Sequence, residues 1–196
     1  MATEIFRESY DDYEIIGGEK FMAPSADLWH NTVVINLIST IGVYAKERQL
    51  GFVFSDSLDV HFPDGNLFKP DFAFISAANS KIVIDNKHST IHGVPDMVAE
   101  IFSRSTMKRD ISVKKDIYER NGVKEYWMID PWRESISVYL LRDGKFELDE
   151  IYFNYTDAEL NDLTDAERAA VKFEVPVNVL DGFTVKIKNI FGWWLE

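Results

Sequence analysis

The amino-acid sequence predicts an α/β or α+β fold, in which helices flank a central mixed β-sheet and a β-hairpin precedes the first helix. Apolar runs at 70–75 and 97–102 are typical of strands that are covered on both faces. Apolar residues at i, i+3 and i+4 spacings over 107–120 indicate an amphipathic helix, and another apolar run follows at 125–130. The order hairpin, helix, strands, helix, strands therefore favours a mixed sheet.

Turn signals and apolar segments alternate through the first half of the chain. Tyr13–Met22 is predicted to be a hairpin because Gly17-Gly18 supplies its turn. Pro24-Ser25 ends that hairpin and offers an N-cap, so a helix rich in apolar positions is expected over 26–47. The segments expected next are short strands at 52–54 and 58–61, a turn at 63–66, the strand at 70–75, and a loop over 76–93 with a candidate short strand at 82–84.

The second half of the chain begins with the strand at 97–102. A helix over 107–120 follows, and Asn121-Gly122 is expected to end it. The strand at 125–130 comes next and is stopped by Pro131. The remaining expected elements are a hairpin of 135–141 with 145–151 around Asp143-Gly144, a surface helix in the acidic stretch 156–172, a strand at 183–187, and an apolar end at 190–194.

The composition permits a hydrophobic core and narrows the possible chemistry. The 196 residues are 46% hydrophobic and 14% aromatic, which fits one domain covering residues 1–196. The absence of cysteine excludes disulfides, thiolate zinc sites and cysteine nucleophiles, and it is compatible with a reducing compartment. The N-terminus lacks the pattern of a signal peptide, and no apolar run reaches the ~18–20 residues of a membrane span. We therefore expect a cytoplasmic protein with no membrane partner.

The net charge of −12 is concentrated in two segments. Residues 1–19 carry a net charge of −5 and residues 149–167 carry −7, so the rest of the chain is neutral on balance. Within that remainder, residues 104–124 carry a net charge of +4. This segment is either a solvated helix of mixed charge or a small basic face that could meet an anionic substrate.

Asp71 and Glu100 each interrupt an apolar, strand-like run. A charged carboxylate in such a run is costly unless it is paired, protonated or bound to a metal. On the helix that follows, Asp110 and Lys114 fall in the apolar stripe, whereas Lys115 falls on another face. Lys114 is therefore expected to lean toward the sheet, where a lysine needs a negative partner such as Asp71 or Glu100.

Two carboxylates and one lysine permit two interpretations. Mg²⁺ or Mn²⁺ could take oxygen ligands from Asp71 and Glu100, together with water and a substrate phosphate. Such a metal activates a water and stabilises charge on phosphorus, and Lys114 would assist, which suffices to hydrolyse a phosphodiester. In the other interpretation, the three side chains form a buried structural ion-pair network. The sequence has no Ser-His-Asp arrangement, P-loop or dinucleotide-binding motif that would favour other chemistry.

Several blocks of sequence resemble a known family. The blocks are Lys69-Pro70-Asp71, then Val94-Pro95-Asp96-Met97-Val98-Ala99-Glu100-Ile101-Phe102-Ser103, then Arg109-Asp110 with Lys114 and Tyr118, and then Gly122-Val123-Lys124-Glu125-Tyr126-Trp127-Met128-Ile129-Asp130-Pro131. They resemble the Uma-type family of proteins assigned as endonucleases, in the PD-(D/E)XK, restriction-endonuclease-like superfamily. The N-terminal hairpin through Glu19, with Pro24 and His30, is similar to the start of that family, so the resemblance touches most of the chain.

The resemblance implies a restriction-endonuclease-like central mixed sheet flanked by helices. It also implies a Mg²⁺ or Mn²⁺ site at Asp71 and Glu100, with Glu19 as an additional acidic catalytic residue. The superfamily pattern places a lysine two residues after the acid, where this chain has Phe102. The resemblance offers Lys114 as a migrated replacement, in agreement with the helical stripe.

Three further residues are candidates for support of this site. His30 is either a packing histidine or a substrate contact, Asp110 could support Lys114, and Tyr118 belongs to the same block. The implied partner is nucleic acid, with DNA favoured over RNA. A homodimer is expected because cutting both strands usually needs two sites. The alternative is a catalytically inactive nuclease-like fold that serves as a nucleic-acid- or protein-binding module, which Phe102 and the −12 charge motivate.

Overall fold

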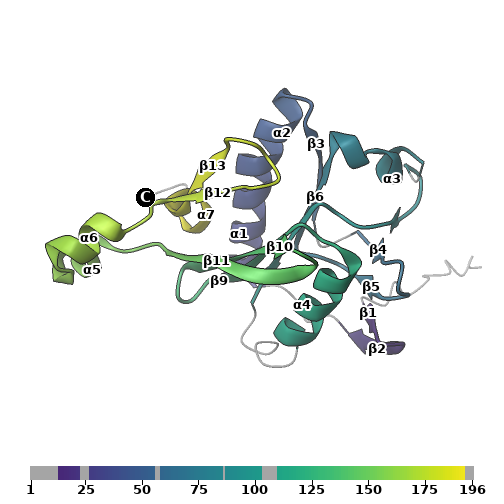
Figure 1. Ribbon diagram of the computed structural model, residues 1–196, viewed down its shortest axis with the longest axis horizontal. Helices are drawn as coiled ribbons and strands as arrows, with labels where there is room; N and C mark the ends of the chain where they lie inside the picture. The colour runs from purple at the N-terminus through teal and green to yellow at the C-terminus, as the bar shows by residue number, and fades with distance from the viewer. Residues whose placement is uncertain (1–12, 23–26, 56–57, 86, 103–109, 193–196) are drawn as a thin grey trace, which may run out of the picture.

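A large mixed sheet forms the centre of the molecule (Figure 1). The computed structural model describes residues 13–22, 27–55, 58–85, 87–102 and 110–192, and the side chains of 110 and 111 lie outside that description. Within these ranges the large sheet has six strands in the order β11-β10-β9-β8-β6-β3. The strands are β3 (Gly51–Ser55), β6 (Phe72–Ser76), β8 (Met97–Ile101), β9 (Glu125–Asp130), β10 (Ser135–Arg142) and β11 (Lys145–Phe153).

One neighbouring pair of this sheet, β8 with β9, is parallel, and the other pairs are antiparallel. Helix α4 (Asp110–Asn121) lies between β8 and β9 in the chain and supplies the crossover that a parallel pair requires. Gly122 ends this helix with φ of +86°, a conformation that glycine adopts at little cost. The predicted mixed sheet and the helix between its two central strands are therefore confirmed.

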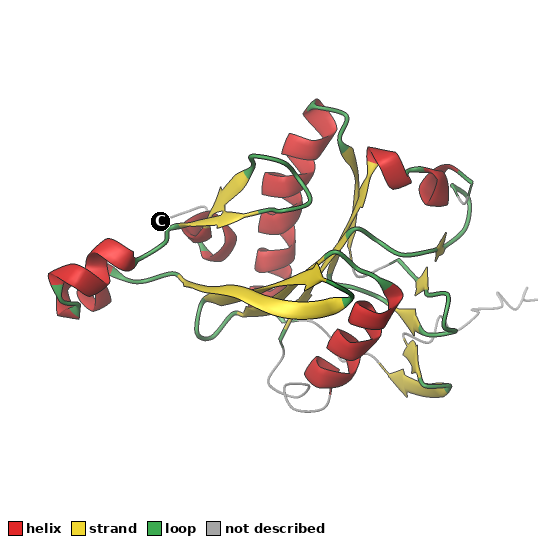
Figure 2. Cartoon of the chain, in the orientation of Figure 1, coloured by secondary structure: helices red, strands yellow, loops and turns green. Residues whose placement is uncertain are grey.

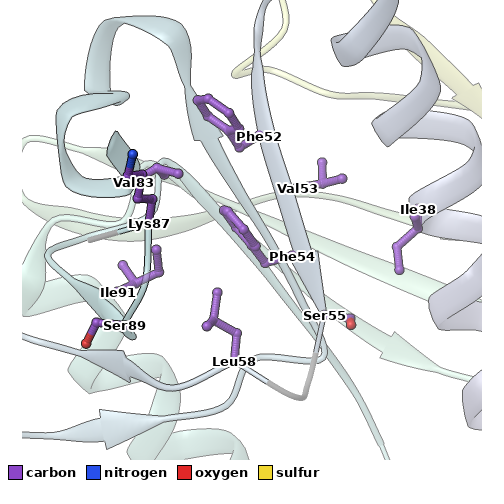
Figure 3. Close-up of a pocket in the computed structure, with 10 residues that line it drawn as sticks. All are labelled: Ile38, Phe52, Val53, Phe54, Ser55, Leu58, Val83, Lys87, Ser89 and Ile91. Carbon is purple, nitrogen blue, oxygen red and sulfur yellow. The ribbon is translucent and has the colours of Figure 1, made fainter. Parts of the chain in front are cut away.

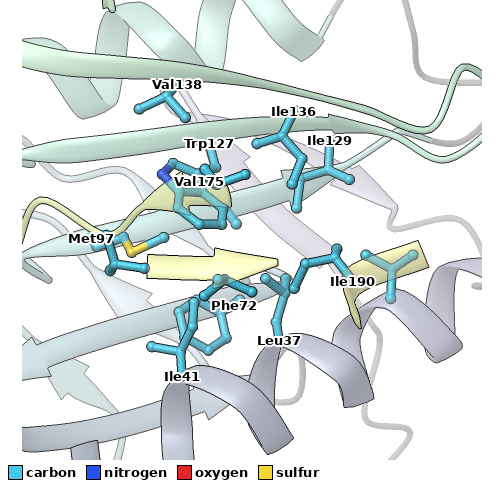
Figure 4. Packing of buried hydrophobic residues seen from close by; sticks show 14 of the residues in the cluster. Leu37, Ile41, Phe72, Met97, Trp127, Ile129, Ile136, Val138, Val175 and Ile190 are labelled. Carbon is cyan, nitrogen blue, oxygen red and sulfur yellow. The ribbon is translucent and has the colours of Figure 1, made fainter. Parts of the chain in front are cut away.

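Each face of the large sheet carries its own hydrophobic core, because alternate strand residues point to opposite sides. On one face, Phe72, Met97 and Trp127 pack against Leu37 and Ile41 of the first helical run (Figure 4). The other face is covered by α4 and a smaller sheet, and its buried residues include Ala73, Ile75, Val98, Ile117, Tyr118 and Tyr126. Glu100 is two residues from Val98 in β8, so its side chain shares the face that α4 covers.

The first helical run extends from Leu28 to Glu47 and begins at an N-cap. The Asp27 side chain accepts a hydrogen bond from the His30 backbone N–H at 2.8 Å, which satisfies a donor at the start of α1 (Leu28–Leu37). A π-helical segment over Ile38–Gly42 joins α1 to α2 (Val43–Glu47). The helix predicted over 26–47 is thus confirmed within the described residues, with one internal change of hydrogen-bond pattern.

A smaller sheet packs beside α4 and carries the predicted N-terminal hairpin. Within the described residues its strand order is β2-β1-β5-β4-β7. The strands are β1 (Tyr13–Ile16), β2 (Glu19–Met22), β4 (Val60–His61), β5 (Leu67–Phe68) and β7 (Ile91–His92). The rings of Phe62 and Phe68 lie against Tyr118 of α4, with centroids 5.6 and 5.3 Å away. Because β5 pairs with β1, this contact places the hairpin beside α4.

Two buried carboxylates lie where β8 and β9 begin, and both are well supplied with donors. Asp96 accepts hydrogen bonds from the Ser76 backbone N–H at 2.8 Å and from Lys124 Nζ at 2.6 Å. Glu125 accepts hydrogen bonds from the Trp127 indole at 2.7 Å and from the backbone N–H of Val179 at 2.9 Å. These contacts connect β9 to the C-terminal part of the chain, and connect the start of β8 to the end of β6.

The peripheral elements include two corrections to the sequence-based expectations (Figure 2). The candidate strand at 82–84 is wrong, since a 3₁₀ turn (Ala77–Asn79) and the short helix α3 (Lys81–Ile84) occupy that region. The single surface helix expected over 156–172 is two helices, because Thr156 and Thr164 each begin one with a capping box. The remaining elements are α5 (Asp157–Asp162), α6 (Asp165–Ala170), β12 (Glu174–Pro176), β13 (Thr184–Lys186) and α7 (Ile187–Phe191). None of the helices in the described part of the chain is long and apolar enough to cross a membrane.

Candidate active site

Strand pairing brings Asp71 and Glu100 to the same end of the large sheet. β6 and β8 pair antiparallel with Phe72 opposite Ala99, so one step further along this register Asp71 stands opposite Glu100. Directly opposed residues of an antiparallel pair project to the same face. Both side chains are almost enclosed, since the Asp71 side chain is 14% exposed and the Glu100 side chain 11%. The two carboxylates predicted from sequence are therefore neighbours with limited access to solvent.

The Asp71 carboxylate is held by two separate elements. Its Oδ1 lies 3.2 Å from Nε2 of His30, in the first turn of α1. Its Oδ2 accepts a 2.6 Å hydrogen bond from the backbone N–H of Ile101, the residue after Glu100. The N-cap by Asp27 places His30, and the β6–β8 register places the Ile101 N–H. The orientation of Asp71 thus depends on the sheet and on the helix that covers its other face.

The Glu100 carboxylate is held by two residues of α4 that are four positions apart. Lys114 Nζ lies 3.1 Å from Oε2, and the Tyr118 hydroxyl donates a 2.5 Å hydrogen bond to Oε1. Residues four apart on a helix are neighbours on one face, so one side of α4 supplies both donors. Lys114 is buried, as the helical stripe predicts, whereas Lys115 lies over the ring of Tyr139 at 4.7 Å.

A third carboxylate, Glu14, completes the cluster and is missing from the sequence-based set. Lys114 Nζ lies 2.8 Å from Glu14 Oε1, and the same oxygen accepts the backbone N–H of Lys69 at 3.1 Å. Glu19, which the family resemblance suggested, is exposed at the start of β2, opposite Ile16. The hairpin register places Glu14 and Glu19 on the same face, so no periodicity in the sequence could separate them. The ion pair with Lys114 is made by Glu14, and the catalytic role expected for Glu19 stays a prediction.

The cluster holds more negative than positive charge, and this shifts the pKa values of Glu100 and Lys114. Burial raises the pKa of Glu100 to about 8; Lys114 and Tyr118 oppose this rise, and the nearby Asp71 and Glu14 add to it. Burial alone would lower the pKa of Lys114, but Glu100 and Glu14 more than offset this and raise it. Lys114 therefore stays an ammonium ion, while Glu100 carries a proton more readily than an exposed glutamate.

Comparison with known proteins identifies the family of this chain. The family model Uma2, described as "Putative restriction endonuclease", matches residues 3–177. The chain belongs to the Uma2 family. A crystal structure described as a "putative nuclease belonging to DUF820 from Anabaena variabilis ATCC 29413" is similar, with a TM-score of 0.69. The two chains are 18% identical over 92% of this chain and 90% of the other, which establishes a shared fold. No match was found among curated proteins.

The predicted Uma-type membership and the nuclease-like mixed fold are thus confirmed. Of the residues expected at the site, the structure joins Asp71, Glu100, Lys114, His30 and Tyr118 through the contacts above. The side chain of Asp110 and residues 103–109 lie outside the described residues. At the position where the superfamily has its lysine, Phe102 donates its backbone N–H to Ile129 O at 2.9 Å, beyond the end of β8. Among the described residues of this Uma2 chain, the ammonium group near the carboxylates comes from Lys114 of α4.

The residues present fit a magnesium-type site better than an all-protein metal cage. No group of three or more histidine and acidic side chains is arranged as a metal-ligand set within the described ranges. Mg²⁺ usually takes one or two carboxylates and completes its shell with water and substrate phosphate. Each carboxylate oxygen of Asp71 and Glu100 can accept more than one contact, so ligand positions remain beside the existing hydrogen bonds. The excess negative charge of the cluster also favours a divalent cation.

The Tyr126 hydroxyl is a buried polar group beside this cluster. Among the described residues, it lacks a hydrogen-bond partner, and its ring lies 5.3 Å from that of Tyr118. Because an unpaired buried hydroxyl costs free energy, we expect Tyr126→Phe to raise the free energy of unfolding by about 1 kcal/mol in urea denaturation. Tyr118→Phe is the matched control and is expected to lower it by a similar amount, since that hydroxyl binds Glu100. A loss of stability in Tyr126→Phe would contradict the prediction.

Proposed function

We propose that this protein is a metal-dependent nuclease that hydrolyses phosphodiester bonds of DNA. The observation that carries the proposal is the meeting of two opposed carboxylates, Asp71 and Glu100, with the buried ammonium group of Lys114 at one end of the sheet. Membership of the Uma2 family supports the same reaction class. The proposed cofactor is Mg²⁺ or Mn²⁺.

Asp71 and Glu100 would hold the cation through their carboxylate oxygens. When bound, a divalent cation of this kind activates a water and stabilises the charge that develops on phosphorus. Asp71 would be oriented for this role by its contacts with the Ile101 N–H and with His30. Glu100 must be ionised to serve as a ligand, and its raised pKa makes that ionisation depend on the arrival of positive charge.

Lys114 would position the attacking water or steady the charge on the transferring phosphate group. Its ammonium is kept charged by Glu14 and Glu100, which is the state needed for either role. Glu14 holds Lys114 from the hairpin side, and Tyr118 holds Glu100 from the helix side. Lys114 is therefore held by contacts with β1 and β8, although it comes from α4 and not from the strand that carries Glu100. Exposed Glu19, on the same hairpin face, remains a candidate to contact substrate.

The acidic segment 149–167 contributes little to the charge that a DNA substrate would meet at this site. Much of the excess lies in residues 149–167, which form the end of β11 and helices α5 and α6. Figure 1 shows α5 and α6 projecting at the opposite end of the molecule from the β1–β2 hairpin. Interactions between exposed charges that are further apart than about 10 Å are largely screened at 0.1 M salt. The acidic arm thus has little influence on a substrate at the cluster.

Calorimetric titration with Mn²⁺ tests this function, using the wild type and an Asp71→Ala/Glu100→Ala variant. We expect binding in the wild type and none in the variant, together with a rise in melting temperature on Mn²⁺ addition that the variant lacks. Plasmid DNA incubated with Mn²⁺ or Mg²⁺ supplies the activity readout. Glu47→Gln, an exposed carboxylate in α2, is the control and is expected to behave as wild type. A wild type that neither binds Mn²⁺ nor cleaves DNA, even when the two are present together, would contradict the proposal.

A second candidate function is a binding module built on an inactive nuclease fold. The observation that favours it is the double ion pair of Lys114 with Glu14 and Glu100, which satisfies the lysine without any metal. This candidate predicts DNA or protein binding that is independent of divalent cations. Binding that survives in Asp71→Ala/Glu100→Ala, with no cleavage by the wild type, would favour it over the nuclease.

A further inference from the structure

The pocket beside β3 does not include the carboxylate cluster. It has a volume of about 540 Å³ and lies against the outermost strand of the large sheet. Figure 3 shows Phe52 and Phe54 on one side of that strand, facing Val83 and Ile91. The described residues that line this pocket are mainly apolar, and none of them belongs to the cluster. A DNA strand that is cut at the cluster therefore needs contacts elsewhere on the surface.

The turn between β9 and β10 carries an exposed aromatic ring next to an exposed cation. Trp132 is 37% exposed, whereas Trp127 is fully buried in the core. The Arg133 side chain is 80% exposed, and its Nε lies 3.9 Å from Asp130 Oδ2. Aromatic rings stack on nucleic-acid bases, and guanidinium groups bind phosphates. The chemistry of this pair of residues therefore suits a nucleic-acid strand.

Strand pairing places this turn at the same end of the large sheet as the cluster. β8 and β9 are parallel, and Glu100 is aligned with Met128. β9 continues past that level to Asp130, and the turn follows directly. Because neighbouring parallel strands run in one direction, their ends lie at the same edge of the sheet. Trp132 and Arg133 thus extend the surface on the β9 side of the cluster.

The turn is also bonded to the helix that contacts Asp71. Trp29 Nε1 donates a 2.7 Å hydrogen bond to Pro131 O. The next residue of α1 is His30, whose Nε2 lies 3.2 Å from Asp71 Oδ1. Two adjacent residues in the first turn of α1 therefore connect the β9–β10 turn with one of the proposed metal ligands.

Hydrogen bonds hold the backbone of the turn in one conformation. Asp130 Oδ1 accepts the backbone N–H groups of Trp132 and Arg133 at 3.0 and 3.1 Å. Asn154 donates its backbone N–H to Glu134 O at 2.9 Å and its side-chain amide to Glu134 Oε2 at 2.6 Å. A binding surface on a fixed backbone loses less conformational entropy when its ligand binds.

We propose that Trp132 and Arg133 bind the DNA strand beside the bond that is cut. The Trp132 ring stacks on an unpaired base, and the Arg133 guanidinium binds a phosphate of the same strand. This inference rests on the proposed nuclease function and names its substrate as DNA that is single-stranded next to the site. A base within a duplex is already stacked on its neighbours and costs free energy to unstack, so the ring selects an unpaired base.

Fluorescence anisotropy with a labelled single-stranded oligonucleotide tests the contact. The variants are made in the Glu100→Gln chain, whose weakened metal site is expected to leave the DNA intact. We expect Trp132→Ala to raise the Kd about 10-fold and Trp132→Phe to raise it much less, because a ring remains. Arg133→Gln is expected to reduce the salt dependence of log K by about 0.7. The matched controls are Phe52→Ala, at a 40% exposed position of β3, and Arg142→Gln, at the other end of β10.

Two further measurements separate this inference from the nuclease proposal. With a blunt duplex of the same sequence, we expect Trp132→Ala to lose less affinity than with the single strand. In Mn²⁺-dependent cleavage of the single strand, Trp132→Ala is expected to raise KM and leave kcat unchanged. Cleavage with the KM of Phe52→Ala, or equal affinity losses on both DNAs, would overturn the inference and leave the nuclease proposal in place. If the wild type does not cleave, its own DNA binding is measured, and binding that Trp132→Ala weakens then supports the contact without the activity.

Discussion

Replacing Glu100 with glutamine is expected to lower the rate of Mn²⁺-dependent DNA cleavage by at least about 100-fold while the protein stays folded. The amide has nearly the shape of the carboxylate and can still accept the hydrogen bond from Tyr118. It lacks the negative charge that a divalent cation needs. Gel analysis of plasmid cleavage, with circular dichroism of the same samples, measures activity and folding separately.

The same substitution has a second readout that does not require activity. Because the pKa of Glu100 is raised from an ordinary value of 4.5 to about 8, the folded protein binds this proton more tightly than the unfolded chain does. The contribution of protonated Glu100 to the free energy of unfolding is fully present below about pH 4.5 and is lost as pH rises toward 8. The metal-free wild type is expected to lose up to about 4 kcal/mol over this window, and Glu100→Gln much less. Equal pH profiles for the two proteins, or undiminished cleavage by purified Glu100→Gln, would refute the role given to Glu100.

Replacing Lys114 with methionine is expected to lower the free energy of unfolding at pH 8 by about 3 kcal/mol. The methionine fills similar space, but it leaves Glu14 and Glu100 enclosed beside Asp71 without the ammonium that contacts two of them. Removal of one partner from a buried ion pair is costly because the remaining charge stays desolvated. Urea denaturation at fixed pH values measures the effect.

The pH dependence identifies the cause of this loss. Without Lys114 the pKa of Glu100 rises further, so the folded variant gains a proton more readily than the unfolded chain. Between about pH 5 and 8 folded Glu100 keeps its proton in both proteins, so we expect the deficit to change little there and to increase above pH 8, where Glu100 ionises in the wild type alone. Lys115→Met is the control, since Lys115 lies over Tyr139 on another face of α4. A deficit of the same size at every pH would mean that packing, and not charge, explains it.

The sequence predicted the structure best where apolar residues follow the spacing of a strand or a helix. The apolar runs around Asp71 and Glu100 predicted buried strands, and the helical stripe predicted that Lys114 faces the sheet. The β6–β8 pairing and the contact of Lys114 with Glu100 agree with those expectations. His30 and Tyr118 came from the family resemblance, and the structure places both against the carboxylates.

The parts that sequence could not supply depend on register and tertiary packing. Glu14 and Glu19 lie on one face of the hairpin, and only the docking of that hairpin against α4 decides which of them reaches Lys114. The segment at 82–84 has β-branched residues typical of a strand, but it forms a short helix beside β7. The pocket beside β3 could not be predicted from the sequence either, because the lining residues Ile38, Val83 and Ile91 come together only in the folded chain.

The two ends of the β8–β9 pair differ in how far the stability of the fold accounts for their charged residues. At the start of these strands, Asp96 and Glu125 have donors for their oxygens, so the fold itself accounts for their presence. At the other end, the cluster of Glu14, Glu100 and Lys114 carries surplus negative charge, and apolar residues of similar size would often stabilise such a position. A lineage selected only for a stable fold would be expected to drift toward that apolar replacement. Directed evolution for thermal stability alone is therefore expected to replace this cluster early, and with it the chemistry proposed for the site.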